Sequence, residues 1–279
     1  MNSFFSDTTQ PAAGSVAVFG LPTDKNSSFR QGAARAPDLI RKALHCPSRN
    51  LCAENGIELT AGSGFADLGN LDIGDRANAN DRITAAVAHV LAHRLKPVAL
   101  GGDHSITYPI IRSFAAVRSE LTLLQFDAHP DLYDSFDGNR FSHACTFARI
   151  MEEKLVARLI QVGIRAMNTP QRKQAQRFGV ETLETSSQRG PVELQLSGPV
   201  YVSIDIDVLD PAFAPGVSHP EPGGLSTRQV LDIIHRIRAP IVGADIVEFN
   251  PERDLGYMTA RTAAKLLKEI AGSMLEAGS

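Results

Sequence analysis

Short apolar runs alternate with segments of helical periodicity along this chain, and that alternation limits the possible folds more than any other feature. The apolar runs lie at residues 16–20, 98–101, 121–126, 159–162, 200–206 and 241–247. Residues 81–94 and 257–274 carry apolar side chains at helical spacing. Parallel strands need long crossovers, and the gaps between the runs leave room for helices there. The pattern predicts an α/β fold with a buried parallel sheet flanked by helices.

Length and charge narrow the class of protein further. The 279 residues suit one large core, and we expect a single domain over residues 14–279 after a loose N-terminal tail at residues 1–13. That tail has neither the basic start nor the apolar stretch of a signal peptide. The net charge of −3 and the lack of basic runs argue against nucleic-acid binding. No apolar run approaches the ~20 residues of a membrane span.

The cysteines indicate a reducing compartment. Cys46, Cys52 and Cys145 are odd in number and show no Cys-x-x-Cys spacing, so a disulfide framework is not expected. We therefore expect a cytoplasmic protein.

Polar residues follow the apolar runs at the positions where parallel sheets build their ligand sites, just beyond the carboxyl ends of the strands. A Gly101–Gly102 turn and His104 follow one run, and Glu248 follows another. Two more runs are followed by acidic or histidine side chains at every second position. They are Asp127, His129 and Asp131 after one run, and Asp205 and Asp207 at the end of the other. In an extended chain, residues spaced in this way share one side.

These residue types together suit divalent metal ions. Imidazole and carboxylate groups bind metals such as manganese, and so many carboxylates at one sheet end would repel one another without a cation. Two metal ions would neutralise them and could lower the pKa of a shared water, so that hydroxide attacks an electrophile. Taken singly, each motif could be a helix cap or an Asx turn. Their joint occurrence after strand candidates favours the metal site.

Other polar residues receive no functional role. We interpret Asp210 as a turn cap before Pro211. The remaining histidines lack ligand-like neighbours and are interpreted as ordinary side chains: His45, His89, His93, His219 and His235. Cys145 lies near His143, but the aspartates would raise the pKa of its thiol, so a nucleophilic cysteine is disfavoured.

Residues 101–105, 127–131 and 203–211 resemble the three metal-binding signatures of the ureohydrolases, a family that includes arginases and agmatinases. Further segments are similar to the rest of that family's pattern, at residues 20–24, 29–33, 214–217, 221–225 and 245–251. The chain looks most like bacterial agmatinase-like proteins and plant arginases. The resemblance implies a three-layer α/β/α sandwich with a mainly parallel sheet, assembled into trimers or hexamers.

The resemblance also implies roles for single residues. Two manganese ions per subunit would be held by His104, Asp127, His129, Asp131, Asp205 and Asp207. Asp131 would orient the attacking hydroxide, Glu248 would pair with a substrate guanidinium, and His143 would carry a proton to the leaving amine. The implied reaction releases urea from a small guanidino compound.

One position departs from the family pattern. Ala144 stands where a glycine usually follows the shuttle histidine, and an alanine would be strained if that position needs a positive φ. This departure keeps open a catalytically silent metal-binding protein. A deacetylase with a single zinc ion is a further alternative, and the full set of six ligands argues against it.

The substrate depends on the loop before His143. Asp134 and Asp137 would suit the distal ammonium of agmatine, whereas Asn139 could serve the carboxylate of arginine. The loop lacks the threonine-, serine- and asparagine-rich run of typical arginases. We therefore expect agmatine, giving putrescine and urea, with arginine as the alternative and another linear guanidine still open.

Overall fold

A computed structural model describes residues 4–5, 11–60, 62–74, 78–187 and 190–276 of the chain. Its strands are β1 (Val16–Leu21), β2 (Phe65–Asn70), β3 (Lys96–Gly101), β4 (Thr122–Phe126), β5 (Arg158–Ile164), β6 (Glu181–Glu184), β7 (Val200–Asp205) and β8 (Ile241–Val247). They form one eight-stranded sheet in the order β2-β1-β3-β8-β7-β4-β5-β6, and every pairing between these strands is parallel. The expected parallel sheet is confirmed.

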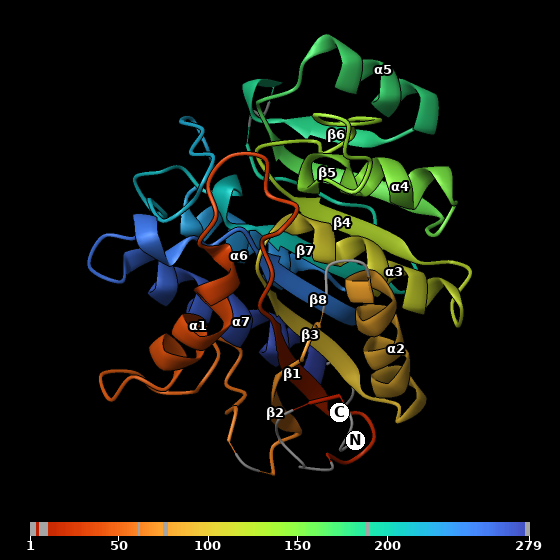
Figure 1. The fold of residues 1–279 in the computed structure, drawn as a ribbon. Helices are drawn as coiled ribbons and strands as arrows, with labels where there is room; N and C mark the ends of the chain where they lie inside the picture. Colours follow the sequence, from red (N-terminus) through yellow and green to blue (C-terminus); the bar gives the residue numbers. More distant parts are fainter. Residues whose placement is uncertain (1–3, 6–10, 61, 75–77, 188–189, 277–279) are drawn as a thin grey trace.

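Helices cover both faces of the sheet (Figure 1). They are α1 (Ala36–Leu44), α2 (Ala79–Ala92), α3 (Thr107–Ala115), α4 (Thr146–Glu152), α5 (Thr169–Phe178), α6 (Thr227–Arg236) and α7 (Met258–Glu276). Helices α1, α6 and α7 bury one apolar core against the sheet, and α2 to α5 bury a second core on the opposite face. The three-layer α/β/α sandwich is therefore confirmed.

Short 3₁₀ helices lie mainly where strands or loops turn into longer helices. They are η1 (Ala33–Arg35), η3 (His104–Ile106), η4 (His143–Cys145), η5 (Thr185–Ser187), η6 (Ile206–Val208) and η7 (Pro251–Arg253). Among the described residues, no helix has both the length and the apolar character needed to cross a membrane.

The two edge strands were not expected from the sequence. Strand β2 is mostly half-buried and includes Asp67 and Asn70, while β6 begins and ends with Glu181 and Glu184. Neither has a continuous apolar run, because an edge strand pairs on one side only and contacts solvent. The inner strands β1, β4 and β7 are buried along their whole length, which explains why their apolar runs were easy to recognise.

Part of the expected N-terminal tail contacts the core. Phe5 is buried, its ring lies 5.3 Å from that of Phe19, and its backbone pairs with Leu71. Residues 1–3 and 6–10 of that predicted tail lie outside the described residues.

A row of buried polar side chains crosses the sheet one layer below its carboxyl edge. Gln161 of β5 pairs with Gln125 of β4, Gln125 pairs with Ser203 of β7, and Ser203 pairs with Asp245 of β8. All four side chains are fully buried, so each needs a hydrogen-bond partner to offset its desolvation. The row lies beneath the ends of the central strands, where the sequence placed its metal ligands.

Gly102 makes the close backbone approach that brings two of these strand ends together. Its carbonyl accepts a 2.8 Å hydrogen bond from the backbone N–H of Glu248, after β8. A Cβ atom at this position would lie 1.6 Å from the carbonyl oxygen of Thr23. Only glycine fits here without moving the backbone.

We expect Gly102→Ala to lower the free energy of unfolding by about 3 kcal/mol, because a methyl group forced onto a backbone carbonyl must displace it. The matched control is Gly56→Ala, whose Cβ would meet nothing within 4 Å and which carries only the strain of a positive φ, roughly 1 kcal/mol. Denaturant unfolding in EDTA, which removes any contribution from bound metal, measures both. Equal midpoints for the two variants would contradict the steric argument.

Candidate metal centre and active site

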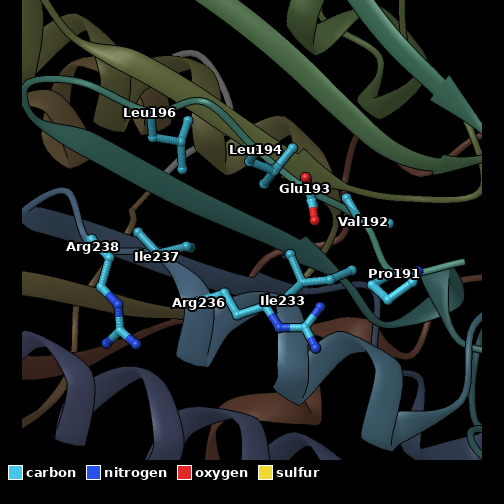
Figure 2. Close-up of a pocket in the computed structure, with 9 residues that line it drawn as sticks. All are labelled: Pro191, Val192, Glu193, Leu194, Leu196, Ile233, Arg236, Ile237 and Arg238. Carbon is cyan, nitrogen blue, oxygen red and sulfur yellow. The ribbon is translucent and has the colours of Figure 1, made fainter.

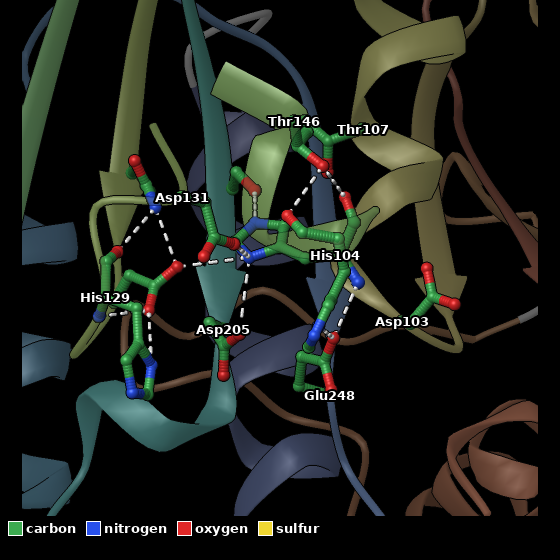
Figure 3. A network of polar contacts seen from close by, with 12 residues as sticks. Asp103, His104, Thr107, His129, Asp131, Thr146, Asp205 and Glu248 are labelled. Carbon is green, nitrogen blue, oxygen red and sulfur yellow. Dashed lines mark hydrogen bonds and ion pairs between the residues drawn. The ribbon is translucent and has the colours of Figure 1, made fainter. Parts of the chain in front are cut away.

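The six predicted metal ligands converge at the carboxyl ends of three central strands. Figure 3 labels four of them, His104, His129, Asp131 and Asp205. His104 begins η3 after β3, and Asp127 directly follows β4. Asp205 ends β7 and Asp207 lies in η6. All the ligand side chains are buried except that of His129, which keeps 26% of its surface exposed.

His104 is surrounded by three carboxylates. Its Nδ1 atom lies 3.1 Å from an oxygen of Asp127, and 3.3 Å from one of Asp131 and one of Asp205. This nitrogen is buried and has no partner with hydrogen-bond geometry among the described residues. A buried nitrogen lone pair facing several carboxylate oxygens is the donor arrangement of a metal site.

A second group of ligands adjoins the first. The Nδ1 atom of His129 lies 2.9 Å from Asp207 Oδ2 and 3.6 Å from Asp127 Oδ1. Asp127 therefore offers Oδ1 to the group around His129 and Oδ2 to the group around His104. A carboxylate shared in this way can bridge two cations.

The electrostatics of this cluster require added positive charge. Burial, reinforced by Asp127, raises the pKa of Asp131 to about 6. Burial and the neighbouring Asp207 raise the pKa of Asp205 well above its usual value. Burial disfavours the charged form of His129, but Asp207 and Asp127 outweigh it and raise the His129 pKa to about 12. The carboxylates cannot all ionise without a cation among them, and the donor set present fits divalent metal ions.

A hydrogen-bonded chain behind His104 sets its tautomer. Ser203 Oγ donates to Asp245 Oδ1 over 2.6 Å, so it accepts the Nε2–H of His104 over 2.9 Å. Asp245 is held in turn by the hydroxyls of Thr107 and Tyr201. With its proton on Nε2, the imidazole presents an unprotonated Nδ1 to the carboxylates, as a metal ligand must.

A second chain supports Asp127. Gln161 donates to Gln125 over 2.6 Å, and Gln125 donates to Asp127 Oδ2 over 2.7 Å. These two glutamines, Ser203 and Asp245 were not expected to support the site. For Gln125, Ser203 and Asp245 the available signal was a polar residue within a buried strand, two or three positions before a proposed ligand or catalytic acid. No such residue follows Gln161.

Glu248 and His143 form a buried pair beside the metal ligands. His143 Nδ1 lies 2.7 Å from Glu248 Oε1, which also accepts the backbone N–H of His104 over 2.8 Å. The backbone N–H of Ser28 donates to His143 Nε2, which in the neutral ring places the proton on Nδ1. Burial opposes a charged imidazole, but Glu248 outweighs it and raises the pKa of His143 to about 9. No donor among the described residues contacts Glu248 Oε2.

Two of the predicted catalytic residues have strained backbones. Asp131 has a φ of 49° and Glu248 a φ of 63°, in the left-handed region that favours glycine. Ala144, by contrast, lies in η4 and is not among the residues with positive φ. The strain considered for an alanine at this position is therefore absent. Burial raises the pKa of the Cys145 thiol to about 11, in agreement with its unreactive interpretation.

The three substrate-loop residues have different surroundings. Asp137 lines a cavity of about 370 Å³ together with Glu248, His143 and metal ligands. Asp134 is outside this lining and pairs with Arg140 at 2.9 Å and Arg149 at 3.2 Å. The Asn139 amide contacts Asn26 and the backbone of Phe141, and lines a separate cavity.

His219 also lines the cavity of Asp137 and Glu248, a placement that the sequence did not predict. Its ring lies 5.2 Å from that of His143 and 6.1 Å from that of His129. His129 and His143 are remote from His219 in the sequence, so local spacing could not indicate that the three rings lie close together. His235 instead pairs with Glu269, and Asp210 accepts backbone N–H groups as the expected turn cap.

Another cavity, of about 350 Å³, lies between residues 191–196 and 233–238 (Figure 2). Arginine and aliphatic side chains dominate its lining, and Glu193 is its one acidic residue among those described. It therefore lacks the ligand chemistry of the site at the strand ends.

We expect Ser203→Ala to weaken manganese binding by about 10–100-fold, because His104 would lose the acceptor that fixes its tautomer. The control is Ser113→Ala, another buried serine, whose hydroxyl bonds to the carbonyl of Thr84 instead. Titration with manganese against a competing chelator measures both affinities. Unchanged affinity in Ser203→Ala would show that the chain behind His104 does not support metal binding.

Comparisons with known proteins find relatives along nearly the whole chain. The Arginase family model matches residues 14–272. Arginase 1, mitochondrial, from Arabidopsis thaliana is 48% identical over 94% of this chain and 82% of its own length. The solved arginase from Medicago truncatula superposes with a TM-score of 0.86 at 40% identity, over 95% of this chain and 89% of that one. Proclavaminate amidino hydrolase from Streptomyces clavuligerus has a TM-score of 0.85 at 30% identity, over 96% and 94%. The chain belongs to the Arginase family of C–N hydrolases.

Proposed function

We propose that this protein hydrolyses the guanidino group of arginine to ornithine and urea. The observation that carries the proposal is the buried Glu248 carboxylate, which has an open oxygen in the cavity beside two ligand groups that share Asp127. A carboxylate in that position suits a guanidinium by charge-assisted hydrogen bonds. The plant relatives at 45–48% identity are named arginases, which favours arginine as the compound that enters.

This proposal replaces agmatine as the preferred substrate. The preference for agmatine rested on two aspartates that would receive an ammonium, and the Asp134 carboxylate is paired with Arg140 and Arg149. Asp137 remains at the cavity and would suit the α-ammonium of arginine. Because agmatine also carries an ammonium, Asp137 alone does not separate the two compounds, and the names of the plant relatives support the choice of arginine.

We further propose that two manganese ions occupy the ligand groups. His104, Asp131 and Asp205 would hold one ion, His129 and Asp207 the other, with Asp127 between them. Bound cations would neutralise the carboxylates and lower the pKa of a water molecule enough for it to attack the guanidino carbon.

The chain's own residues would perform the remaining steps. Asp131 would accept a hydrogen bond from the attacking water and orient it. Glu248 would hold the guanidinium plane through Oε2. His143 carries a proton on Nδ1 and would supply the proton that the leaving amine needs.

We expect the manganese-loaded protein to release urea from arginine with a kcat/KM at least about tenfold above that for agmatine, a difference of about 1.4 kcal/mol in transition-state binding. Both compounds, and a guanidino acid without the α-ammonium, are assayed at one pH. A preference for agmatine would restore the earlier substrate expectation. Absence of urea from every guanidine, with metal bound, would favour the catalytically silent alternative.

We expect elemental analysis to find two manganese ions per wild-type chain and one in His129→Ala, because that change removes a ligand from only one group. His235→Ala, which changes a histidine outside the cavity, is the control and should keep two ions. Equal metal content in His129→Ala and wild type would contradict the assignment of His129 as a ligand.

We propose a homo-oligomer, a trimer or a hexamer, which light scattering would measure. We also propose a cytoplasmic location, although several relatives are named mitochondrial, and cell fractionation would decide between these compartments.

A further inference from the structure

Two loops that are remote in sequence contribute to the wall of the cavity that Glu248 lines. Ser28 and Phe29 belong to the loop between β1 and η1, and His219 lies between η6 and α6. The Ser28 hydroxyl contacts His219 Nε2 at 3.4 Å, and the rings of Phe29 and His219 lie 5.7 Å apart. None of these residues has a role in the mechanism above.

Asn250, just after β8, forms hydrogen bonds with both loops. Its amide donates to the carbonyl of Gln31 over 3.0 Å and to the hydroxyl of Ser218 over 2.9 Å. Ser218 in turn donates to the carbonyl of Arg30 over 2.9 Å. Asn250 is buried and lies two residues after Glu248, so the wall is held in a fixed position relative to that carboxylate.

Among the described residues, the ring of His219 makes fewer hydrogen-bond contacts than that of His143. Both nitrogens of His143 are engaged, Nδ1 by Glu248 and Nε2 by Ser28. The contact that His219 makes through Nε2 is the long one to the Ser28 hydroxyl. A neutral imidazole has one unprotonated nitrogen, so the ring of His219 can accept a hydrogen bond.

Distances favour a shared ligand between His219 and Glu248. A ring nitrogen of His219, a ring nitrogen of His143 and a carboxylate oxygen of Glu248 all lie within 4.8 Å of one another. A planar NH₂ group donates two hydrogen bonds of about 2.9 Å that diverge by about 120°, so its two acceptors lie roughly 5 Å apart. One NH₂ group of a guanidinium therefore fits between His219 and Glu248.

We propose that His219 is a substrate-contacting residue that binds the guanidino group together with Glu248, and that Ser28 is a positioning residue that fixes the two imidazoles. This inference rests on the proposed guanidino hydrolysis. The Ser28 backbone N–H sets the tautomer of His143, and its hydroxyl lies between His143 Nε2 at 2.8 Å and His219 Nε2 at 3.4 Å.

The test uses the guanidinium ion as the probe, because it contains the group in question and no distal end. Its affinity for manganese-loaded protein is measured by calorimetry, and ornithine, which has the distal end without a guanidino group, is measured beside it. We expect His219→Phe, which keeps a ring against Phe29 and removes both nitrogens, to weaken guanidinium binding about tenfold or more. Ornithine affinity and manganese content should stay within twofold of wild type. His219→Gln, which restores an acceptor, should recover part of the loss.

The control variant is His93→Phe, on the exposed end of α2, which should bind guanidinium as wild type does. Guanidinium affinity within twofold of wild type in His219→Phe, or an equal loss for ornithine, would overturn the role of His219. A wild-type protein that binds guanidinium but does not hydrolyse arginine would instead remove the proposed substrate and leave this role intact.

Ser28→Ala tests the positioning role, because it removes the hydroxyl and keeps the backbone N–H. We expect a loss of guanidinium affinity of about two- to fivefold, and no further loss when the change is made in His219→Phe. Equal losses in both backgrounds would show that Ser28 does not act through His219.

Discussion

The crowding of four buried aspartates at one edge of the sheet is the constraint on which the rest of this structure depends. Carboxylates removed from water repel one another, so burial first and neighbouring acids second raise the pKa of Asp131 and Asp205. Folding therefore builds a site that is complete only with bound metal. The same crowding explains why the ligands sit on strands and short turns of the rigid centre of the sheet, where their separation is fixed.

The row of polar side chains below the ligands shows how the sheet meets this constraint. Gln125 bonds to Asp127, and Ser203 bonds to His104, so each contacted ligand has a fixed orientation. These residues pair across adjacent strands, which makes the register of the sheet part of the metal site. A shift of one residue would turn every one of these side chains toward the opposite face.

Backbone strain marks the two residues that would act on the substrate and the attacking water. Asp131 and Glu248 both have positive φ, a conformation that costs about 1–3 kcal/mol each for a residue with a side chain. Buried contacts hold them there: Glu248 accepts the backbone N–H of His104, and its own N–H bonds to Gly102. Asn250 hydrogen-bonds to Ser218, next to His219, and so links this wall to the same strand end. The proposed substrate contacts and the candidate metal ligands are therefore held in fixed positions relative to one another.

The sequence by itself determined the class of fold and the place of the candidate metal ligands, because fully buried parallel strands carry apolar runs and ligand sites lie beyond their carboxyl ends. It did not reveal β2 and β6, whose solvent-facing edges need no apolar run. It also assigned His219 no role and favoured an ammonium partner in Asp134. Only the tertiary structure showed where these side chains lie, because Ser28 and His219 are 191 residues apart, and Asp134 pairs with two arginines. Local spacing in the sequence can identify residues that follow one strand. It cannot identify a cavity wall made by two distant loops, because those loops meet only after the sheet has formed.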